Sequence, residues 1–303
     1  MAEADALPQL LQYRERRWLD HCADVLEHLL LPLAQRWHNQ PQLDAVRGAV
    51  LIENRIDQQW LFTVLNTALM CPPGTQLCLI TDRAVRSEAQ SMLREIALPV
   101  EPWWGVAEEL VPGTALNDPA RFNHMLKQPQ LWEALPHEKV LLIQTDALLA
   151  QPLPAFFFSY SYLGAPFLPA QQSEMFEQRS QQGQLVGFFK VDTAIHGRPN
   201  PDMYPHLHGN GGLSIRHCSV MRAICERYGS HSTAEEMEDV FFSRHISRLS
   251  EATPLEIAQA FACESRYQPT AIGSHAGWKY WSSNELADHL DRHWRAVWSL
   301  LTA

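Results

Sequence analysis

An apolar segment in the middle of the chain ends in polar residues that could bind a ligand. Residues 140–143 (VLLI) must form a buried strand, and Gln144, Thr145 and Asp146 follow directly. In open α/β sheets ligands bind outside the carboxyl ends of the strands, where a carboxylate can coordinate a divalent cation or accept a hydrogen bond from a ribose. Asp146 is therefore a candidate binding residue, although an aspartate in this position also commonly caps the following turn.

Two later motifs carry residues with a possible chemical role. Asn210, Gly211 and Gly212 belong to the segment GNGGLSIR, where glycines allow positive φ and a close approach to a ligand, as they also do in an ordinary tight turn. Glu238 and Asp239 directly precede an apolar VFF triplet. We expect one of these carboxylates to point inward and to be able to act as a general base, while the alternative is surface charge that complements a helix dipole.

Other polar residues follow predicted strands or lie close to the C-terminus. Glu53 and Arg55 come after the first strand, and Asp82 comes after the second. Each of these can also be a simple capping residue. His275 lies between two glycines, ahead of an aromatic group (GSHAGWKYW), and could bind a metal or a diphosphate, although an isolated histidine is more often a structural hydrogen-bonding residue.

The best-known catalytic motifs are missing from the sequence. It has no phosphate-binding P-loop, no GxGxxG after the first strand, no GxSxG and no HExxH. A nucleotidyltransferase could use the same strand-end acid, but no loop rich in lysine and arginine follows the first strand. A metallohydrolase could use His206 and His208 with His196 and His217, but these lie in an irregular segment without carboxylates at a recognisable spacing.

The elements that must position these residues alternate between strand and helix patterns. Predicted strands cover residues 50–52, 76–80, 100–104 and 139–143, and helices cover residues 57–70, 83–96 and a segment from 117. This alternation is typical of a parallel sheet covered by helices on both faces. Residues 170–206 are rich in glutamine and proline with weak periodicity, which predicts a long loop or insertion.

Helical segments flank this region at both ends. Apolar residues recur every three or four positions over residues 7–39, which predicts an amphipathic helix that ends near Pro32. Ser282 and Glu285 form a capping box before a final helix whose apolar face includes Trp298. We therefore divide the chain into an N-terminal helical extension (1–45), one α/β domain (46–282) and a C-terminal helix (283–303).

Composition and charge narrow the possible partners and location. The 303 residues are 46% hydrophobic and carry a formal charge of −10, which argues against nucleic acid or an anionic membrane surface as the main partner. The acidic N-terminus does not resemble a secretory signal, and no stretch approaches about 18 uninterrupted apolar residues. We expect a cytoplasmic protein, whose six scattered cysteines are reduced thiols in the core.

The order of these motifs resembles that of the GT-A-fold glycosyltransferases. In that fold an aspartate motif after a central strand precedes a glycine loop, an x-Glu-Asp motif and a C-terminal histidine. The sequence looks most similar to a GT-A-like family catalogued as a domain of unknown function, over roughly residues 48–282. The matching segments are VLIENR (50–55), QTD (144–146), YLGAP (162–166), GNGGLSIR (209–216), EDVFF (238–242), FACE (261–264) and GSH (273–275).

The resemblance implies an α/β fold with a mixed, mostly parallel sheet, and transfer of a sugar from a nucleotide-sugar donor to an acceptor. It implies that Asp146 and His275 bind a divalent cation, Mn²⁺ or Mg²⁺, at the donor diphosphate. Glu53, Arg55 and, more weakly, Asp82 would line the nucleotide pocket. Asn210, Gly211 and Gly212 would shape the cleft for the donor sugar and the acceptor.

The resemblance also implies the catalytic base and contains one departure. Asp239 would deprotonate the acceptor, with Glu238 as the alternative. Gln144 stands where the usual Asp-x-Asp motif has its first acid, so metal affinity could be lower, or the first contact could be to the ribose only. A non-catalytic nucleotide-sugar-binding module of the same fold is the alternative that this substitution favours.

Overall fold

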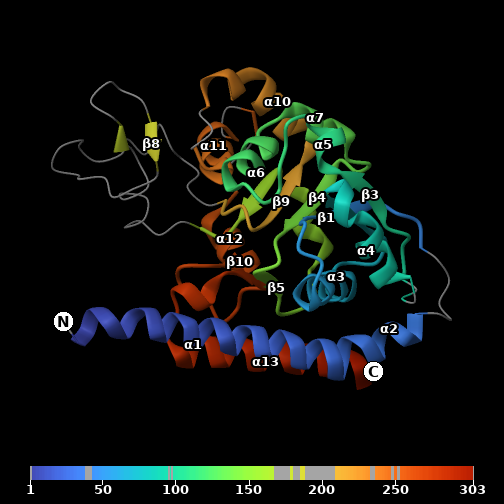
Figure 1. Cartoon of the computed structure of the whole chain (residues 1–303), viewed down its shortest axis with the longest axis vertical. Helices are drawn as coiled ribbons and strands as arrows, with labels where there is room; N and C mark the ends of the chain where they lie inside the picture. Colours follow the sequence, from blue (N-terminus) through green and yellow to red (C-terminus); the bar gives the residue numbers. More distant parts are fainter. Residues whose placement is uncertain are drawn as a thin grey trace.

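The structure is a computed structural model of the chain (Figure 1). It describes residues 2–37, 43–94, 96, 98–166, 178–179, 185–187, 209–232, 236–246, 249–250 and 253–302. In this part of the chain the fold is an α/β architecture built around one six-stranded sheet. The expected mixed, mostly parallel sheet with helices at both ends is confirmed.

The central sheet has the strand order β3-β2-β1-β4-β9-β6. Its strands are β1 (Arg47–Ile52), β2 (Thr75–Thr81), β3 (Trp103–Val106), β4 (Lys139–Ile143), β6 (Tyr162–Gly164) and β9 (Leu213–His217). β3, β2, β1 and β4 are parallel, whereas β9 runs antiparallel to both of its neighbours. The carboxyl ends of β1 and β4 therefore meet at the same edge, with Leu51 opposite Ile143.

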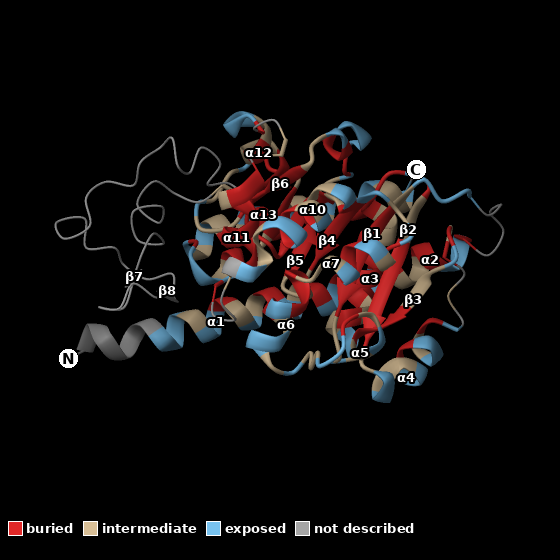
Figure 2. Ribbon diagram, turned by 90° about the horizontal axis from the view of Figure 1, so that it is seen from above, coloured by how far each residue is buried: buried red, intermediate tan, exposed pale blue. Residues whose placement is uncertain are grey.

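Alternate side chains of the sheet enter two hydrophobic cores on its two faces. In β1, Ala49 and Leu51 belong to the first core, while Val50 and Ile52 belong to the second, as the two-residue period of a strand requires. Figure 2 shows the buried sheet between helices that are exposed on their outer sides. The first core takes side chains from α3 (Gln58–Met70), α4 (Arg83–Leu93), η2 (Ala155–Ser159) and α12 (Leu255–Phe261).

The helices of the second core cover the opposite face of the sheet. They are α5 (Ala107–Leu110), α6 (Pro119–Leu126), α7 (Pro129–Ala134), α10 (Cys218–Tyr228), which is followed by η3 (Gly229–His231), and α11 (Glu238–His245). Because every strand of the central sheet lies between the two cores, the loops at the strand ends are held from both sides. This arrangement fixes the positions of the candidate site residues.

A second, three-stranded sheet lies beside the carboxyl end of β4. It has the order β10-β11-β5, from β10 (Ala262–Cys263), β11 (Gly273–His275) and β5 (Ala147–Leu149). β11 and β5 are antiparallel, with His275 opposite Ala147. This pairing joins the segment that follows β4 to the late histidine motif, which is followed by the short helix η5 (Gly277–Lys279).

The two ends of the chain form long helices that pack against each other (Figure 1). They are α1 (Ala2–Val25), a π-helical turn η1 (Leu26–Leu30), α2 (Leu31–Trp37) and, at the other end, α13 (Ser283–Thr302). The prediction that the first helix ends near Pro32 is wrong, because the helix continues to Trp37. Proline is tolerated in the first turn of α2, and the preceding π-helical turn accommodates its missing N–H.

The capping box before α13 is confirmed, since Glu285 Oε2 accepts a hydrogen bond from the Ser282 backbone N–H at 2.8 Å. Trp298 does not belong to the buried face of this helix, because 51% of it is exposed. His289 and His293 are buried there instead. An apolar periodicity alone could not show that histidines replace hydrophobic residues on this face.

Smaller differences from the predicted elements occur at their ends. α4 stops at Leu93, before the predicted end at residue 96, and β3 is shifted to Trp103–Val106. Within the predicted loop 170–206, β7 (Gln178–Arg179) and β8 (Leu185–Gly187) pair antiparallel, and the other residues of this segment lie outside the described part. The division of the chain at residues 45 and 282 stays a prediction.

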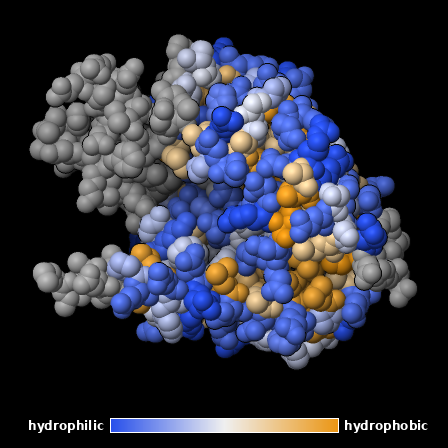
Figure 3. All heavy atoms as spheres, in the orientation of Figure 1, coloured by the Kyte–Doolittle hydropathy of each residue, from blue (hydrophilic) through white to orange (hydrophobic). Residues whose placement is uncertain are grey.

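All six cysteines are free and buried, as expected. Among the described helices, none combines the length and the apolar character that a membrane crossing needs. The face drawn in Figure 3 is mainly hydrophilic, with its hydrophobic residues in separate groups.

Candidate functional site

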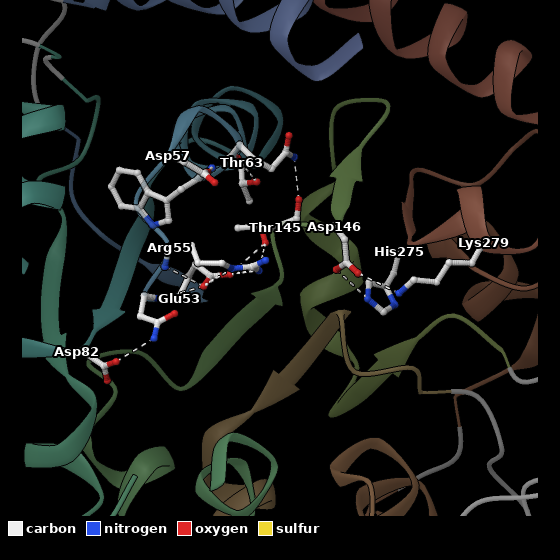
Figure 4. A network of polar contacts seen from close by, with 12 residues as sticks. Glu53, Arg55, Asp57, Thr63, Asp82, Thr145, Asp146, His275 and Lys279 are labelled. Atoms are coloured by element: carbon white, nitrogen blue, oxygen red, sulfur yellow. Dashed lines mark hydrogen bonds and ion pairs between the residues drawn. The ribbon is translucent and has the colours of Figure 1, made fainter. Parts of the chain in front are cut away.

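The ends of β1 and β4 bring Glu53, Arg55 and Thr145 into one polar network (Figure 4). The Arg55 guanidinium donates to the Glu53 carboxylate at 2.6 Å, and Thr145 Oγ1 donates to the same carboxylate at 3.2 Å. Burial alone would raise the pKa of Glu53, but the hydrogen bonds and charge of Arg55 outweigh it and lower that pKa. The network therefore holds the Arg55 guanidinium in place at the carboxyl ends of β1 and β4.

Asp146 and His275 lie side by side because β5 and β11 pair next to them. His275 Nε2 is 3.0 Å from Asp146 Oδ1, and Lys279 Nζ is 3.4 Å from Asp146 Oδ2. Burial opposes the charge of each group, but the attraction between them wins. It raises the pKa of His275 to about 10, and with Lys279 it holds the pKa of Asp146 well below its usual range.

Glu264 connects His275 to the glycine-rich turn. Its Oε1 lies 3.3 Å from His275 Nδ1, and its Oε2 accepts a hydrogen bond from Asn210 Nδ2 at 2.8 Å. Asn210 Oδ1 in turn accepts from the Gly212 backbone N–H at 3.1 Å. The Glu264 carboxylate thus lies beside the imidazole, whose Nδ1 has no hydrogen-bond partner among the described residues, and it helps to fix the conformation of the turn.

The glycines of this turn are required by close packing. A Cβ on Gly211 would collide with the Glu238 carboxylate, and one on Gly212 would collide with the His275 ring. The expected positive φ is not found there, since within the described residues Gly74 and Gly113 are the glycines that have it. The turn also pairs with the strand-end motif, because the Gln144 backbone N–H donates to the Gly212 carbonyl at 2.9 Å.

Glu238 forms a buried, two-pronged ion pair with Arg216. The two guanidinium nitrogens of Arg216 lie 2.6 and 3.0 Å from the Glu238 oxygens. Arg216 is fully buried and packs against the rings of Trp132, Tyr162 and Phe242. The Glu238 carboxylate is therefore engaged in a structural ion pair. Of the two adjacent acids, Asp239 is the more available carboxylate.

Asp239 lies at the start of α11 and is 8% exposed. It accepts hydrogen bonds from the backbone N–H groups of Val240 (2.8 Å) and Gly211 (3.3 Å), and within the described residues no cationic side chain forms an ion pair with it. Burial, with added repulsion from Glu238 and Glu264, raises the pKa of Asp239 to about 7. Both acids of this motif point inward, where we expected one.

A cleft of about 910 Å³ opens over the ends of β1 and β4. Glu53, Arg55, Gln144 and Asp146 all line it, and Lys279 lines it as well. Its further lining residues include Gln59, Phe122 and Trp278, together with Glu15, Trp18 and Leu19 from α1. A volume of this size is in the range of small-molecule sites.

Not every predicted site residue lines this cleft. Asp82 accepts a hydrogen bond from Asn54 Nδ2 at 3.1 Å but does not belong to the lining. Asp239 and Glu238 lie deeper, behind the glycine turn, and are connected to Asp146 through Glu264 and His275. His217 contacts the Phe158 carbonyl at 3.0 Å, whereas His196, His206 and His208 lie outside the described residues.

Asp146 and His275 could supply only part of the ligand set of a divalent cation, and the His275 imidazole, whose pKa is raised to about 10, would have to lose its proton on binding. Within the described ranges, no three His, Cys, Asp or Glu side chains are arranged to hold a metal ion by themselves. Asp146 and His275 are nevertheless adjacent, and the Glu264 carboxylate beside Nδ1 is the usual partner of a metal-binding histidine. Since Mg²⁺ and Mn²⁺ are commonly bound by few carboxylates and by substrate phosphates, a diphosphate would have to complete this set.

Three contributors to the site were not assigned a role from the sequence. Lys279 follows His275 by four residues, and Glu264 belongs to the FACE segment. For both residues, the signal available in the sequence was a charged side chain in or near a recognised motif. The lining residues of α1 had no such signal, because apolar spacing predicts only that this helix is packed. Their contribution depends on tertiary packing.

A family described as "Protein of unknown function (DUF5672)" matches residues 106–275, more than half of the chain. A search of curated protein sequences found no match. The expected resemblance to a GT-A-like family of unknown function is confirmed.

One solved glycosyltransferase shares the fold, and two others align with lower scores. The apo structure of the bifunctional glycosyltransferase WbbM aligns with a TM-score of 0.51 at 8% identity, over 87% of this chain and 53% of that one. Mouse xyloside xylosyltransferase 1 aligns with 0.44 at 10% identity (77% and 98%), and GlyE of Streptococcus pneumoniae TIGR4 with 0.42 at 11% (84% and 63%). The chain thus spans about half the length of WbbM, and the fold is glycosyltransferase-like.

Proposed function

The chain belongs to the DUF5672 family of proteins of unknown function, and from the site that it builds on a glycosyltransferase-like fold we propose that it transfers a sugar from a nucleotide-sugar donor to an acceptor. One observation carries the proposal. Asp146 and Lys279 line a large cleft at the strand ends, His275 contacts Asp146 beside it, and a partly buried series of contacts through Glu264, Asn210 and the Gly211 backbone leads to the Asp239 carboxylate.

Charge and position suggest how the donor would lie in the cleft. Glu53 and Arg55 line it on the β1 side and would contact the nucleoside, while Lys279 and Arg55 offer cationic groups to the diphosphate. Gln144 would contact the donor through its neutral side-chain amide, because glutamine carries no charge. Asp146 and His275 would hold a divalent cation, which when bound stabilises the negative charge on the departing diphosphate.

Asp239 is the residue we propose as general base. A pKa of about 7 leaves a carboxylate able to accept a proton near neutral pH, and the backbone N–H groups of Val240 and Gly211 hold it in place. In the transfer, the acceptor oxygen bonds to the anomeric carbon as the bond to the diphosphate oxygen breaks. Asp239 takes the proton of the acceptor hydroxyl, and the nucleoside diphosphate leaves.

The test is a binding and turnover assay with a panel of nucleotide sugars. UDP-, GDP- and ADP-sugars are titrated calorimetrically in the presence of Mn²⁺, and release of nucleoside diphosphate is followed in the same samples. We expect at least one donor to bind, and the variant Asp146→Asn to lose at least about tenfold in affinity because it removes a charged ligand at the diphosphate. The matched control is Asp291→Asn, which changes an exposed carboxylate paired with Arg295 on α13.

The outcomes separate the proposal from its rivals. Failure of the wild-type chain to bind any donor, or full turnover by both Asp146→Asn and Asp239→Asn, would overturn it. Pyrophosphate release from a nucleoside triphosphate would identify a nucleotidyltransferase. Tight binding of a donor without hydrolysis or transfer to any acceptor tried would indicate a binding module.

A further inference from the structure

The N-terminal helix α1 forms part of the wall of the cleft that contains Asp146. Glu15, Trp18 and Leu19 all line it. They lie three and four residues apart, so they share one face of the helix. This helix precedes the segment that matches the family, which begins at residue 106. The cleft of this chain therefore contains a wall that neither the family match nor the strand-end motifs account for.

α1 is held firmly in this position. Trp18, Cys22 and Val25 are buried in the first core, and the buried Arg14 guanidinium donates a hydrogen bond to the Trp281 carbonyl. Trp281 lies two residues after the end of η5, so this contact ties α1 to the short helix that carries Lys279. Figure 1 shows α1 running alongside α13 beneath the sheet. A lining residue on so fixed a helix can act as a preorganised binding group.

The side chains of this wall determine which kind of ligand group can bind against it. Glu15 is partly exposed in the cleft, and no ion pair joins it to another described residue. A carboxylate repels a diphosphate but accepts hydrogen bonds from neighbouring hydroxyl groups. Trp278 is half-buried and lines the same cleft, and its indole ring offers flat apolar surface to the C–H face of a sugar ring, whereas Trp18 is 5% exposed and mainly anchors α1 in the first core.

We propose that Glu15 and Leu19 of α1 form, with Trp278, a subsite for a neutral, hydroxylated sugar ring, in which the Glu15 carboxylate accepts hydrogen bonds from ring hydroxyls. The subsite rests on the proposed function, because the strand ends beside it would hold the nucleoside diphosphate. Three rings share this chemistry, namely the ribose, the transferred sugar and a sugar of the acceptor.

The experiment compares Glu15→Ala with Asp20→Ala, a carboxylate on the exposed side of the same helix that does not line the cleft. The probes for calorimetry are UDP, UDP-glucose, GDP, GDP-mannose and, with UDP bound, methyl β-glucoside. We expect Glu15→Ala to weaken binding of at least one probe about tenfold, as loss of a hydrogen bond to a charged group does, and Asp20→Ala to change it less than twofold.

The pattern of losses identifies the ring. Equal weakening of a nucleoside diphosphate and its sugar conjugate assigns the ribose, and weakening of the conjugate alone assigns the transferred sugar. Weakening of methyl β-glucoside alone assigns the acceptor. The thermal midpoint of each variant shows whether it is folded, and Glu15→Gln repeats the test with a side chain of the same size.

Two results would overturn the inference while leaving the proposed function intact. One is wild-type affinity of Glu15→Ala for every probe that the wild-type chain binds, and the other is an equal loss in Asp20→Ala. If the wild-type chain binds no nucleotide or nucleotide sugar, the proposed function fails and the subsite fails with it.

Discussion

The Asp239 carboxylate lies inside the protein next to two other carboxylates, those of Glu238 and Glu264. Glu238 is neutralised by Arg216, and Glu264 contacts His275 and Asn210, whereas Asp239, among the residues that the structure describes, accepts hydrogen bonds from two backbone N–H groups. The three acids thus have different surroundings, although two are adjacent in the sequence. Environments that push the pKa values of nearby acids apart are typical of sites that use one of them as a base.

If Asp239 is the base, turnover depends on pH near neutrality. Its pKa is raised to about 7, so the carboxylate is mostly protonated at pH 6 and mostly ionised at pH 8. The rate of sugar transfer at low donor concentration should therefore rise about tenfold per pH unit below pH 7 and level off above it. The measurement is the pH profile of transfer, with Asp239→Asn as the inactive reference. A flat profile from pH 5.5 to 8 would exclude this role.

The buried ion pair between Arg216 and Glu238 supports the glycine turn. Replacing Arg216 by Met leaves the Glu238 carboxylate buried without its cation, because this guanidinium is fully buried and contacts both carboxylate oxygens. We expect the free energy of unfolding to fall by about 3–5 kcal/mol in Arg216→Met. Urea unfolding measures the change. The double variant Arg216→Met with Glu238→Gln should recover part of it, and no recovery would show that packing of Arg216 against its aromatic neighbours dominates.

Among the elements, the terminal helices are joined by a row of buried histidines. His21 of α1 is 2.9 Å from His293 of α13, and His293 Nε2 is 2.8 Å from Asn66 of α3. Asn66 also holds the β5 backbone, donating to the Leu149 carbonyl and accepting from its N–H. The row therefore links both ends of the chain to the strand that follows Asp146.

These histidines make the helix pair sensitive to acid. Burial lowers the pKa of His21 from 6.5 to about 4, so the unfolded chain binds a proton between these pH values that the folded chain does not. Above pH 6.5 this histidine therefore does not reduce the free energy of unfolding, and the free energy of unfolding falls as the pH drops towards 4. At pH 4.5, the lowered pKa of His21 alone should reduce the free energy of unfolding by about 2 kcal/mol relative to its value above pH 6.5.

The measurement is urea unfolding at pH 7 and pH 4.5 for the wild type and His21→Gln. We expect the variant to lose less stability between the two pH values, because glutamine does not titrate. His28→Gln, an exposed position in the following turn, serves as the control and should keep the wild-type difference. Identical acid sensitivity in all three proteins would contradict the explanation.

For the molecule as a whole, the alternation of strands and helices followed from patterns that are local in sequence, whereas the strand order β3-β2-β1-β4-β9-β6 was not predicted. β4 begins and ends where predicted, and the strand-end residues Glu53 and Asp146 were recognised because parallel strands end at one edge. The contributions of Glu15 and Lys279 to the cleft could not be predicted, because they depend on how α1 and η5 pack on the sheet. The buried His293 of α13 was missed for a related reason, since its partners His21 and Asn66 are more than two hundred residues away.

The terminal helices belong to the same core as the sheet, and this predicts a single cooperative unfolding transition. Trp18 is 5% exposed and packs in the first core with β1 and β4 side chains, whereas Trp298 on α13 is 51% exposed. Trp18→Ala should therefore lower the free energy of unfolding by about 3–5 kcal/mol, and Trp298→Ala by well under half of that. The measurement is urea unfolding followed in parallel by far-ultraviolet circular dichroism and tryptophan fluorescence. If α1 unfolded independently of the sheet, Trp18→Ala would leave the main midpoint unchanged and add a separate early transition. Coincident curves shifted together would instead show that the helix forming one wall of the cleft is as stable as the strands β4 and β5 on either side of Asp146.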